Sequence, residues 1–179
     1  MTDTEYRKLL GNSPAYFRRV LVFMRDTGCR TGELCALRWE HVDLGAALIA
    51  MTKHKTGHAT QAPRIIALCP VVIKLLQRIR ASRTIETEAD HVFLNGIGLP
   101  FSRHVLAHRL RRIRKRAGIS DEVTLYTLRH RFATKALRNG VDLKTVSTML
   151  GHTSVRMTEH YLHYAGSEHL KKAIALAVK

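Results

Sequence analysis

Four short segments of this 179-residue chain bring together cationic, imidazole and phenolic side chains beside glycines. The segments read TGCRTGELCALRW, KHKTGH, LYTLRHRFAT and LGHTSVRMTEHYLHY. Guanidinium groups can bind phosphate oxygens in pairs and stay charged, and neighbouring cations lower the cost of turning a phenol into a nucleophile. Each segment taken alone is also typical of a surface charge, a solvated turn or half-buried packing. Their polar residues of interest are Arg30, Lys53, Lys55, Arg129, His152, Tyr161 and Tyr164.

The charge of the whole chain favours a polyanionic partner. There are 30 Lys and Arg residues against 14 Asp and Glu residues, which gives a net charge of +16. In a globular domain this balance indicates nucleic acid first and an anionic membrane surface second. A charged surface that serves only solubility is the alternative.

The basic residues are concentrated in one predicted helix. Residues 102–116 read SRHVLAHRLRRIRKR and contain no acidic residue. Leu106, Leu110 and Ile113 recur at steps of four and three, so they share one helical face, and Arg and Lys cover much of the rest. Such a helix can pack on a core and turn its cations to a phosphate backbone. Its narrow apolar face favours packing against protein, because a membrane-bound helix would carry Trp, Phe or several Leu there.

Hydrophobic spacing and the positions of glycine and proline predict the elements that hold these segments. Apolar residues recur at helical spacing over 15–27. Two β-prone stretches, 47–53 and 64–68, flank a polar turn and predict a hairpin, and a short strand is expected at 91–94. The chain is therefore predicted to be α+β, mainly α-helical, with a small antiparallel β-sheet in one domain. The other predicted helices cover residues 3–10, 33–39, 70–82, 102–116, 126–139, 143–150, 155–161 and 168–178.

Several classes of protein are disfavoured by the composition. No apolar run of about 18 residues is present, and the N-terminus lacks the apolar stretch of a signal peptide, so a cytoplasmic protein without a membrane contact is expected. Cys29, Cys35 and Cys69 have no metal-type spacing and are predicted to be reduced thiols in or near the core. The acidic residues are scattered, and His160 and His163 lack the spacing of zinc proteases. We therefore expect neither a metal nor another cofactor.

Taken together, the four segments resemble the tyrosine recombinase, or phage integrase, family. TGCRTGELCALRWEHVDL resembles the first arginine box of the family, and the lysine turn followed by RIIALCP resembles its β-hairpin. TLRHRFAT resembles the arginine–histidine box, and LGHTSVRMTEHYLHY resembles the closing box. Their order and spacing agree as well. The resemblance implies that residues 1–179 form a single catalytic domain, without the N-terminal core-binding domain that family members commonly carry.

The resemblance implies a site-specific recombinase or integrase that cleaves and rejoins DNA through a 3′-phosphotyrosine intermediate. This transesterification is independent of metal. Arg30 and Arg129 would bind the non-bridging oxygens of one scissile phosphate, and His152 would donate a further hydrogen bond to it. Tyr161 would be the nucleophile, and Lys55 would protonate the leaving 5′-oxygen.

The resemblance also implies supporting residues, one of which departs from the family pattern. Glu33 would support the first arginine, and His130 would face the phosphate or a residue that binds it. Tyr126 stands where the family usually has a histidine, three residues before Arg129. A tyrosine hydroxyl can donate a hydrogen bond there but cannot become a cation.

Two positions have rivals nearby. Tyr161 is favoured over Tyr164 as the nucleophile because Tyr161 and His163 match the Tyr-x-His pattern of the family. Lys55 is favoured over Lys53 as the general acid because Lys55 precedes Thr-Gly, as the family's lysine often does.

Double-stranded DNA is the implied partner. Recombination in this family uses four protomers on two DNA sites, so a homotetramer on DNA and a monomer in the free protein are expected. Two alternatives use the same residues: a type IB topoisomerase-like enzyme, which relaxes supercoils, and a catalytically weak or inactive DNA-binding module, which Tyr126 suggests. The residues expected to contact DNA are Arg103, Arg109, Arg111, Arg112, Arg114, Lys115 and Arg116.

Overall fold

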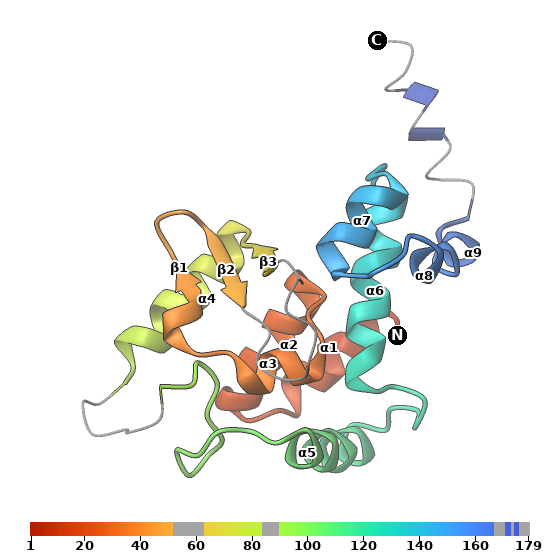
Figure 1. Ribbon diagram of the computed structural model, residues 1–179. Helices are drawn as coiled ribbons and strands as arrows, with labels where there is room; N and C mark the ends of the chain where they lie inside the picture. Colours follow the sequence, from red (N-terminus) through yellow and green to blue (C-terminus); the bar gives the residue numbers. More distant parts are fainter. Residues whose placement is uncertain (52–62, 84–89, 167–170, 173, 176–179) are drawn as a thin grey trace.

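The chain folds into helices arranged around one small sheet (Figure 1). The computed structural model describes residues 1–51, 63–83, 90–166, 171–172 and 174–175. The elements in chain order are α1 (Asp3–Gly11), α2 (Ala15–Thr27), α3 (Thr31–Ala36), the short 3-10 helix η1 (Trp39–His41), β1 (Val42–Asp43), β2 (Leu48–Met51), β3 (Arg64–Ala67), α4 (Pro70–Ala81), α5 (Arg103–Arg116), α6 (Leu125–Arg138), α7 (Leu143–Leu150), α8 (Arg156–Glu159) and α9 (Leu162–Ala165).

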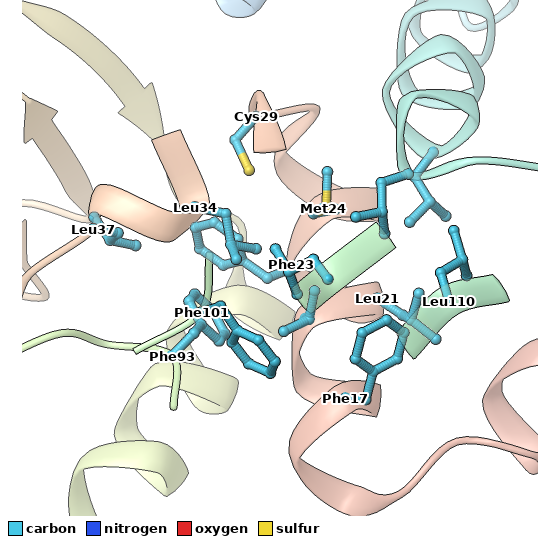
Figure 2. Close-up of a cluster of buried hydrophobic side chains, with 14 of the residues drawn as sticks. Phe17, Leu21, Phe23, Met24, Cys29, Leu34, Leu37, Phe93, Phe101 and Leu110 are labelled. Atoms are coloured by element: carbon cyan, nitrogen blue, oxygen red, sulfur yellow. The ribbon is translucent and has the colours of Figure 1, made fainter. Parts of the chain in front are cut away.

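Helix α2 lies at the centre of the main core. The four apolar residues that predicted this helix, Phe17, Val20, Leu21 and Met24, are all buried. Helices α4 and α6 pack against α2, and Figure 2 shows Phe17, Leu21 and Met24 in the cluster that also includes aromatic rings of the 92–101 segment. Burial of each large apolar side chain stabilises the fold by about 1.5–3 kcal/mol, so α2 forms the fixed base on which the functional elements rest.

The basic helix α5 packs as its sequence predicts. Leu106, Leu110 and Ile113 are buried, and its opposite side carries the cations. The Ser102 hydroxyl begins the helix by accepting a hydrogen bond from the Val105 N–H (3.2 Å). In Figure 1, α5 crosses beneath α2 and α3 and leaves one long side uncovered.

The sheet is antiparallel, with strand order β1-β2-β3. Ile49 of β2 pairs with Val42 on one side and Ile66 on the other, and Ile49 and Ile66 turn inward to the core. The predicted hairpin is thus confirmed. Strand β1 is an additional strand, and its two residues are too few to show hydrophobic alternation in the sequence.

Local predictions were wrong in three segments: 91–94, 33–39 and 155–161. The segment 91–94 forms only isolated bridges, His91 with Arg38 and Leu94 with Pro100, so its apolar residues join the core without a continuous ladder. The helix predicted at 33–39 is α3, which begins earlier because the Glu33 carboxylate accepts the Arg30 N–H (2.7 Å).

The helix predicted at 155–161 is interrupted. Its first part is α8, and α9 begins only after Tyr161, so this tyrosine lies at a bend between two short helices. The helix predicted at 168–178 falls largely outside the described residues.

Two helices end in glycines that no other residue could replace without strain. Gly28 ends α2 and Gly151 ends α7, with φ of 62° and 64°, in the left-handed region. A Cβ at Gly28 would lie 2.5 Å from Cδ1 of Phe132, and one at Gly151 would lie 2.7 Å from Cδ of Arg64. The backbone at the ends of α2 and α7 therefore packs directly against the side chains of Phe132 and Arg64, with no room for a Cβ between them.

Gly28→Ala is expected to destabilise the fold strongly. The left-handed conformation costs an alanine about 1–2 kcal/mol, and displacing the Phe132 ring adds about 1–3 kcal/mol. Urea unfolding followed by circular dichroism measures the change in free energy of unfolding. Gly11→Ala is the control, because a Cβ there meets nothing within 4 Å and needs no positive φ. Equal stability of the two variants would contradict the prediction.

All three cysteines are free thiols, as predicted: Cys29 is buried, and Cys35 and Cys69 are half-buried. Among the helices that the structure describes, none is both long and apolar enough to cross a membrane.

Candidate active site

Three arginines from separate parts of the chain converge on the carboxyl end of α7. Arg30 precedes α3, Arg64 begins β3 and Arg129 lies in α6. Together they donate hydrogen bonds to four successive carbonyls, those of residues 148–151. The contacts are Arg64 Nη1 to Thr148 (3.3 Å), Arg64 Nη2 to Met149 (2.5 Å), Arg129 Nη2 to Leu150 (2.8 Å) and Arg30 Nη2 to Gly151 (2.7 Å).

The end of a helix explains why these cations can gather. The last carbonyls of an α-helix lack partners within the helix, and they carry the negative end of its dipole. At α7 the arginine side chains supply the missing donors and the complementary charge. The carboxyl end of α7 therefore offsets part of the repulsion between the three guanidinium groups.

Arg129 is the most deeply placed of the three. It is 3% exposed, and its Nη1 donates to the carbonyl of Gly28 (2.7 Å), so one guanidinium joins the ends of α2 and α7. Burial, followed by the nearby charge of Arg30, lowers the pKa of Arg129 from its ordinary value. That ordinary value is so far above neutrality that the group stays charged.

Arg30 is held by a carboxylate as well as by α7. Its Nη1 donates to Oε1 of Glu33 (2.8 Å), and the same Oε1 lies 3.5 Å from Nε of Arg64. The Arg30 side chain remains 42% exposed, so one side of its guanidinium faces solvent while the other is anchored.

His152 follows α7 directly and is neutral at pH 7. Its Nδ1 lies 2.7 Å from Oγ1 of the buried Thr158. Burial first, then the charges of Arg129 and Arg30, lowers the pKa of His152 to about 4. When the Thr158 hydroxyl donates to Nδ1, the ring proton resides on Nε2, and a neutral imidazole can donate it to an anion.

Tyr161 is fully buried among three imidazole rings. Its ring lies parallel to that of His152, with centroids 6.4 Å apart, and meets the edge of His130 at 4.9 Å. The ring of His160 lies at 3.8 Å on another side. The aromatic ring is therefore held on several sides by neighbouring rings.

The Tyr161 hydroxyl lies 3.0 Å from the hydroxyl of Tyr126, in the first turn of α6. Burial, followed by this hydrogen bond, raises the pKa of Tyr161 above its ordinary value, although the charge of Arg129 acts in the opposite direction. In this conformation Tyr161 is a neutral phenol, and Tyr126, which is 56% exposed, stands between it and solvent.

A pocket of about 220 Å³ brings the cations together. Arg30, Arg129 and His152 line it with Tyr126, whereas Tyr161 does not. Two guanidinium groups and an imidazole around one space suit an anion with several acceptor oxygens, such as a phosphate. The full lining is Met24, Cys29, Arg30, Thr31, Leu125, Tyr126, Arg129, His152 and Met157.

Some predicted site residues lie outside this description. Lys53 and Lys55 fall within 52–62, outside the described residues, and the side chain of Tyr164 is not described either. Across the part of the chain that the structure does describe, no group of three or more His, Cys, Asp or Glu could hold a metal ion.

The cations of α5 form a second basic surface. Arg103 lies against the start of α3, because a Cβ at Gly32 would be 2.2 Å from its Nη2. A hollow of about 380 Å³ further along is lined only by Arg109, Arg112, Lys115 and Arg116.

Three of the seven predicted α5 cations also have structural contacts. The Arg109 guanidinium lies 5.7 Å from the Tyr16 ring, Arg114 donates to the carbonyls of Asp121 and Val123, and Arg116 donates to the carbonyl of Asn12 (3.2 Å). Arg109 and Arg114 are half-buried, and the other five side chains are exposed.

Arg64 is the site residue that the sequence did not reveal. As the first residue of a predicted strand, it resembled an ordinary exposed cation at a turn. Nothing local indicates that it reaches α7, more than 80 residues further along the chain.

Comparison with known proteins identifies the family. The sequence profile of the phage integrase family matches residues 1–168. The chain belongs to the phage integrase family. This confirms the resemblance of the four segments, and the mainly helical fold with a small antiparallel sheet agrees with it.

Individual relatives of this phage integrase family member are tyrosine recombinases. The chain is 33% identical over 155 residues to tyrosine recombinase XerD of Staphylococcus saprophyticus and, equally, to XerD of Staphylococcus aureus. The alignment covers 84% of this chain and 51% of XerD. The chain thus spans about half the length of the curated relatives it matches.

Solved structures share the fold. The crystal structure of XerA recombinase has a TM-score of 0.79 and 29% identity, over 99% of this chain and 64% of XerA. The Tn1549 transposon integrase, in complex with circular intermediate DNA, has a TM-score of 0.76 over 90% of this chain and 61% of the integrase, with 21% identity. The predicted fold class is therefore confirmed.

Proposed function

We propose that this chain is the catalytic domain of a site-specific DNA recombinase that cleaves and rejoins strands through a 3′-phosphotyrosine intermediate. The observation that carries the proposal is the convergence of Arg30, Arg129 and His152 on one pocket beside the buried Tyr161. The names of the XerD and XerA relatives support it.

The proposed reaction is an in-line substitution at phosphorus. Arg30 and Arg129 bind the non-bridging oxygens, and His152 donates one further hydrogen bond, which stabilises the charge that develops on them. The Tyr161 oxygen forms a bond to phosphorus and transfers its proton to solvent water. The bond from phosphorus to the 5′-oxygen breaks, and Lys55 protonates that oxygen. The covalent link conserves the phosphodiester, so rejoining is the reverse reaction.

The Tyr161 hydroxyl must first become accessible. Tyr126 lines the pocket and Tyr161 does not, so either the Tyr161 oxygen moves toward the phosphate or Tyr126 moves aside. Tyr126 occupies the sequence position where the family usually has a histidine, and its hydroxyl is hydrogen-bonded to that of Tyr161 (3.0 Å). Its phenol can orient the attacking oxygen but is a poor acceptor for the proton of Tyr161.

Tyr126→His is therefore expected to cleave DNA about 100-fold faster than the wild type at pH 7–8, the lower end of the range for a general base. A neutral imidazole can accept the Tyr161 proton, so the advantage falls as pH drops below about 6.5 and the imidazole becomes protonated. Single-turnover cleavage rates measured from pH 5 to 9 test this. Tyr126→Phe is the control, and matching profiles for both variants would contradict the prediction.

We also propose that double-stranded DNA binds along α5 and that four protomers assemble on two DNA sites. The exposed cations of α5 and the adjacent position of Arg103 beside α3 support a continuous path for phosphates into the pocket. The structure of the Tn1549 integrase is of a complex with circular intermediate DNA, and that of XerH recombinase has its difH substrate bound. We also propose that the protein acts in the cytoplasm.

A suicide-substrate assay tests the proposed function. DNA sites are first selected by the protein from a randomised pool. Nicked duplexes that carry these sites are then incubated with the protein, and denaturing gels detect covalent protein–DNA adducts. Mass spectrometry of the adduct is expected to place the nucleotide on Tyr161. Strand exchange between two duplexes supports recombination, whereas relaxation of supercoils alone would support the topoisomerase-like alternative. Binding without any adduct would support an inactive DNA-binding module.

A further inference from the structure

Arg64 is a nearly buried cation that the proposed reaction does not use. Its side chain is 9% exposed, and it is not among the residues that line the pocket. Its Nη1 donates to the carbonyls of Ile65 and Thr148, its Nη2 donates to the carbonyl of Met149, and its Nε lies 3.5 Å from Glu33 Oε1. A guanidinium in this position binds no substrate but joins three elements: β3, α7 and α3.

Both anchors of Arg30 are in contact with Arg64. Arg30 is held on one side by Glu33 and on the other by the carbonyl of Gly151. Arg64 pairs with the same carboxylate oxygen, and its Cδ and Nε would lie 2.7 Å from a Cβ at Gly151. The backbone of Gly151 leads directly to His152. Arg64 therefore touches the supports of two pocket residues without entering the pocket.

We propose that Arg64 is a positioning residue, which fixes the end of α7 relative to Glu33 so that Arg30 and His152 face the same phosphate. The inference rests on the proposed function. Without the guanidinium, the carbonyls of Thr148 and Met149 lose their side-chain donor, and Glu33 is left with Arg30 alone. The carboxyl end of α7 can then shift relative to α3, and the two phosphate donors lose their common alignment.

The test compares Arg64→Met and Arg64→Lys with the wild type. Arg64→Met keeps an unbranched apolar stem but removes every donor, and we expect cleavage about 10²-fold slower at saturating DNA, the effect of a misplacement near 1 Å. The affinity for DNA should change by less than about threefold, because phosphate contacts set affinity and Arg64 does not line the pocket. Arg64→Lys should recover part of the rate, since an ammonium can still donate to one carbonyl.

Arg18→Met is the matched control. Arg18 also donates to a backbone carbonyl, that of Ser13 (2.7 Å), but it lies at the start of α2, away from the pocket. Its cleavage rate should equal that of the wild type. Equal rates for Arg64→Met and the wild type would overturn the inference, as would a loss of DNA affinity that accounts for the whole reduction.

Hydrogen exchange separates this inference from the proposed function. In Arg64→Met, amides of 147–152 and 30–36 should exchange faster, while those of α4 remain unchanged. Faster exchange throughout the protein, or no change in the exchange of these two segments, would contradict the positioning role. If the wild type forms no adduct, the proposed function fails, whereas localised exchange would still show that Arg64 aligns these two segments.

Discussion

A Tyr161→Phe variant is expected to bind DNA as tightly as the wild type and to form no covalent adduct. The phenolic oxygen is the atom that would form the bond to phosphorus, and phenylalanine removes only that atom. The ring keeps its place between His130, His152 and His160. The lost hydrogen bond leads to Tyr126, whose exposure allows water to replace it, so the fold should be nearly as stable.

The measurement is the yield of adduct on nicked duplex DNA, beside a binding titration and a thermal melt. Tyr164→Phe is the control, because it removes the same atom from the rival tyrosine and should leave the adduct unchanged. An adduct that persists in Tyr161→Phe and disappears in Tyr164→Phe would move the nucleophile to Tyr164. Loss of DNA binding in Tyr161→Phe would show that the variant fails before the cleavage step.

Arg129→Lys is expected to slow cleavage by about 10²–10³-fold, the usual effect of removing one preorganised donor to a developing oxyanion. Two N–H donors of the guanidinium already bind the carbonyls of Gly28 and Leu150, and its remaining N–H groups are needed to bind the phosphate. A lysine ammonium has three donors at one point and cannot reach the ends of two helices and a phosphate together.

The same substitution should also lower stability. A buried carbonyl that loses its donor costs about 1–3 kcal/mol, and two carbonyls depend on Arg129. Cleavage must therefore be measured at a temperature where unfolding curves show the variant to be folded. Arg131→Lys, two residues along the same helix, is the control, since its partners are Asp3 and the Met1 carbonyl. Comparable cleavage by both variants would contradict the role of Arg129.

Local sequence was least informative where the chain bends or pairs over very short lengths. The apolar residues at 91–94 looked like a strand, but each bridge there has a different partner segment. The helical spacing of 155–161 continued through Tyr161, yet the chain forms two short helices that meet at this residue. In both cases the backbone conformation was determined by packing against the core, and such packing leaves no periodic pattern in the sequence.

The sequence by itself determined the family, the long helices and the identity of the principal polar residues. Helices such as α2 and α5 are specified by contacts between residues three and four positions apart, and the four motifs are local strings. Only the tertiary structure decided how Arg30, Arg64 and Arg129 meet at the end of α7. Those contacts join residues 121, 85 and 21 positions apart, and Arg129 reaches Gly28 across 101. Carbonyls at the end of a helix can recruit donors from any part of the chain, so their partners become visible only in the folded molecule.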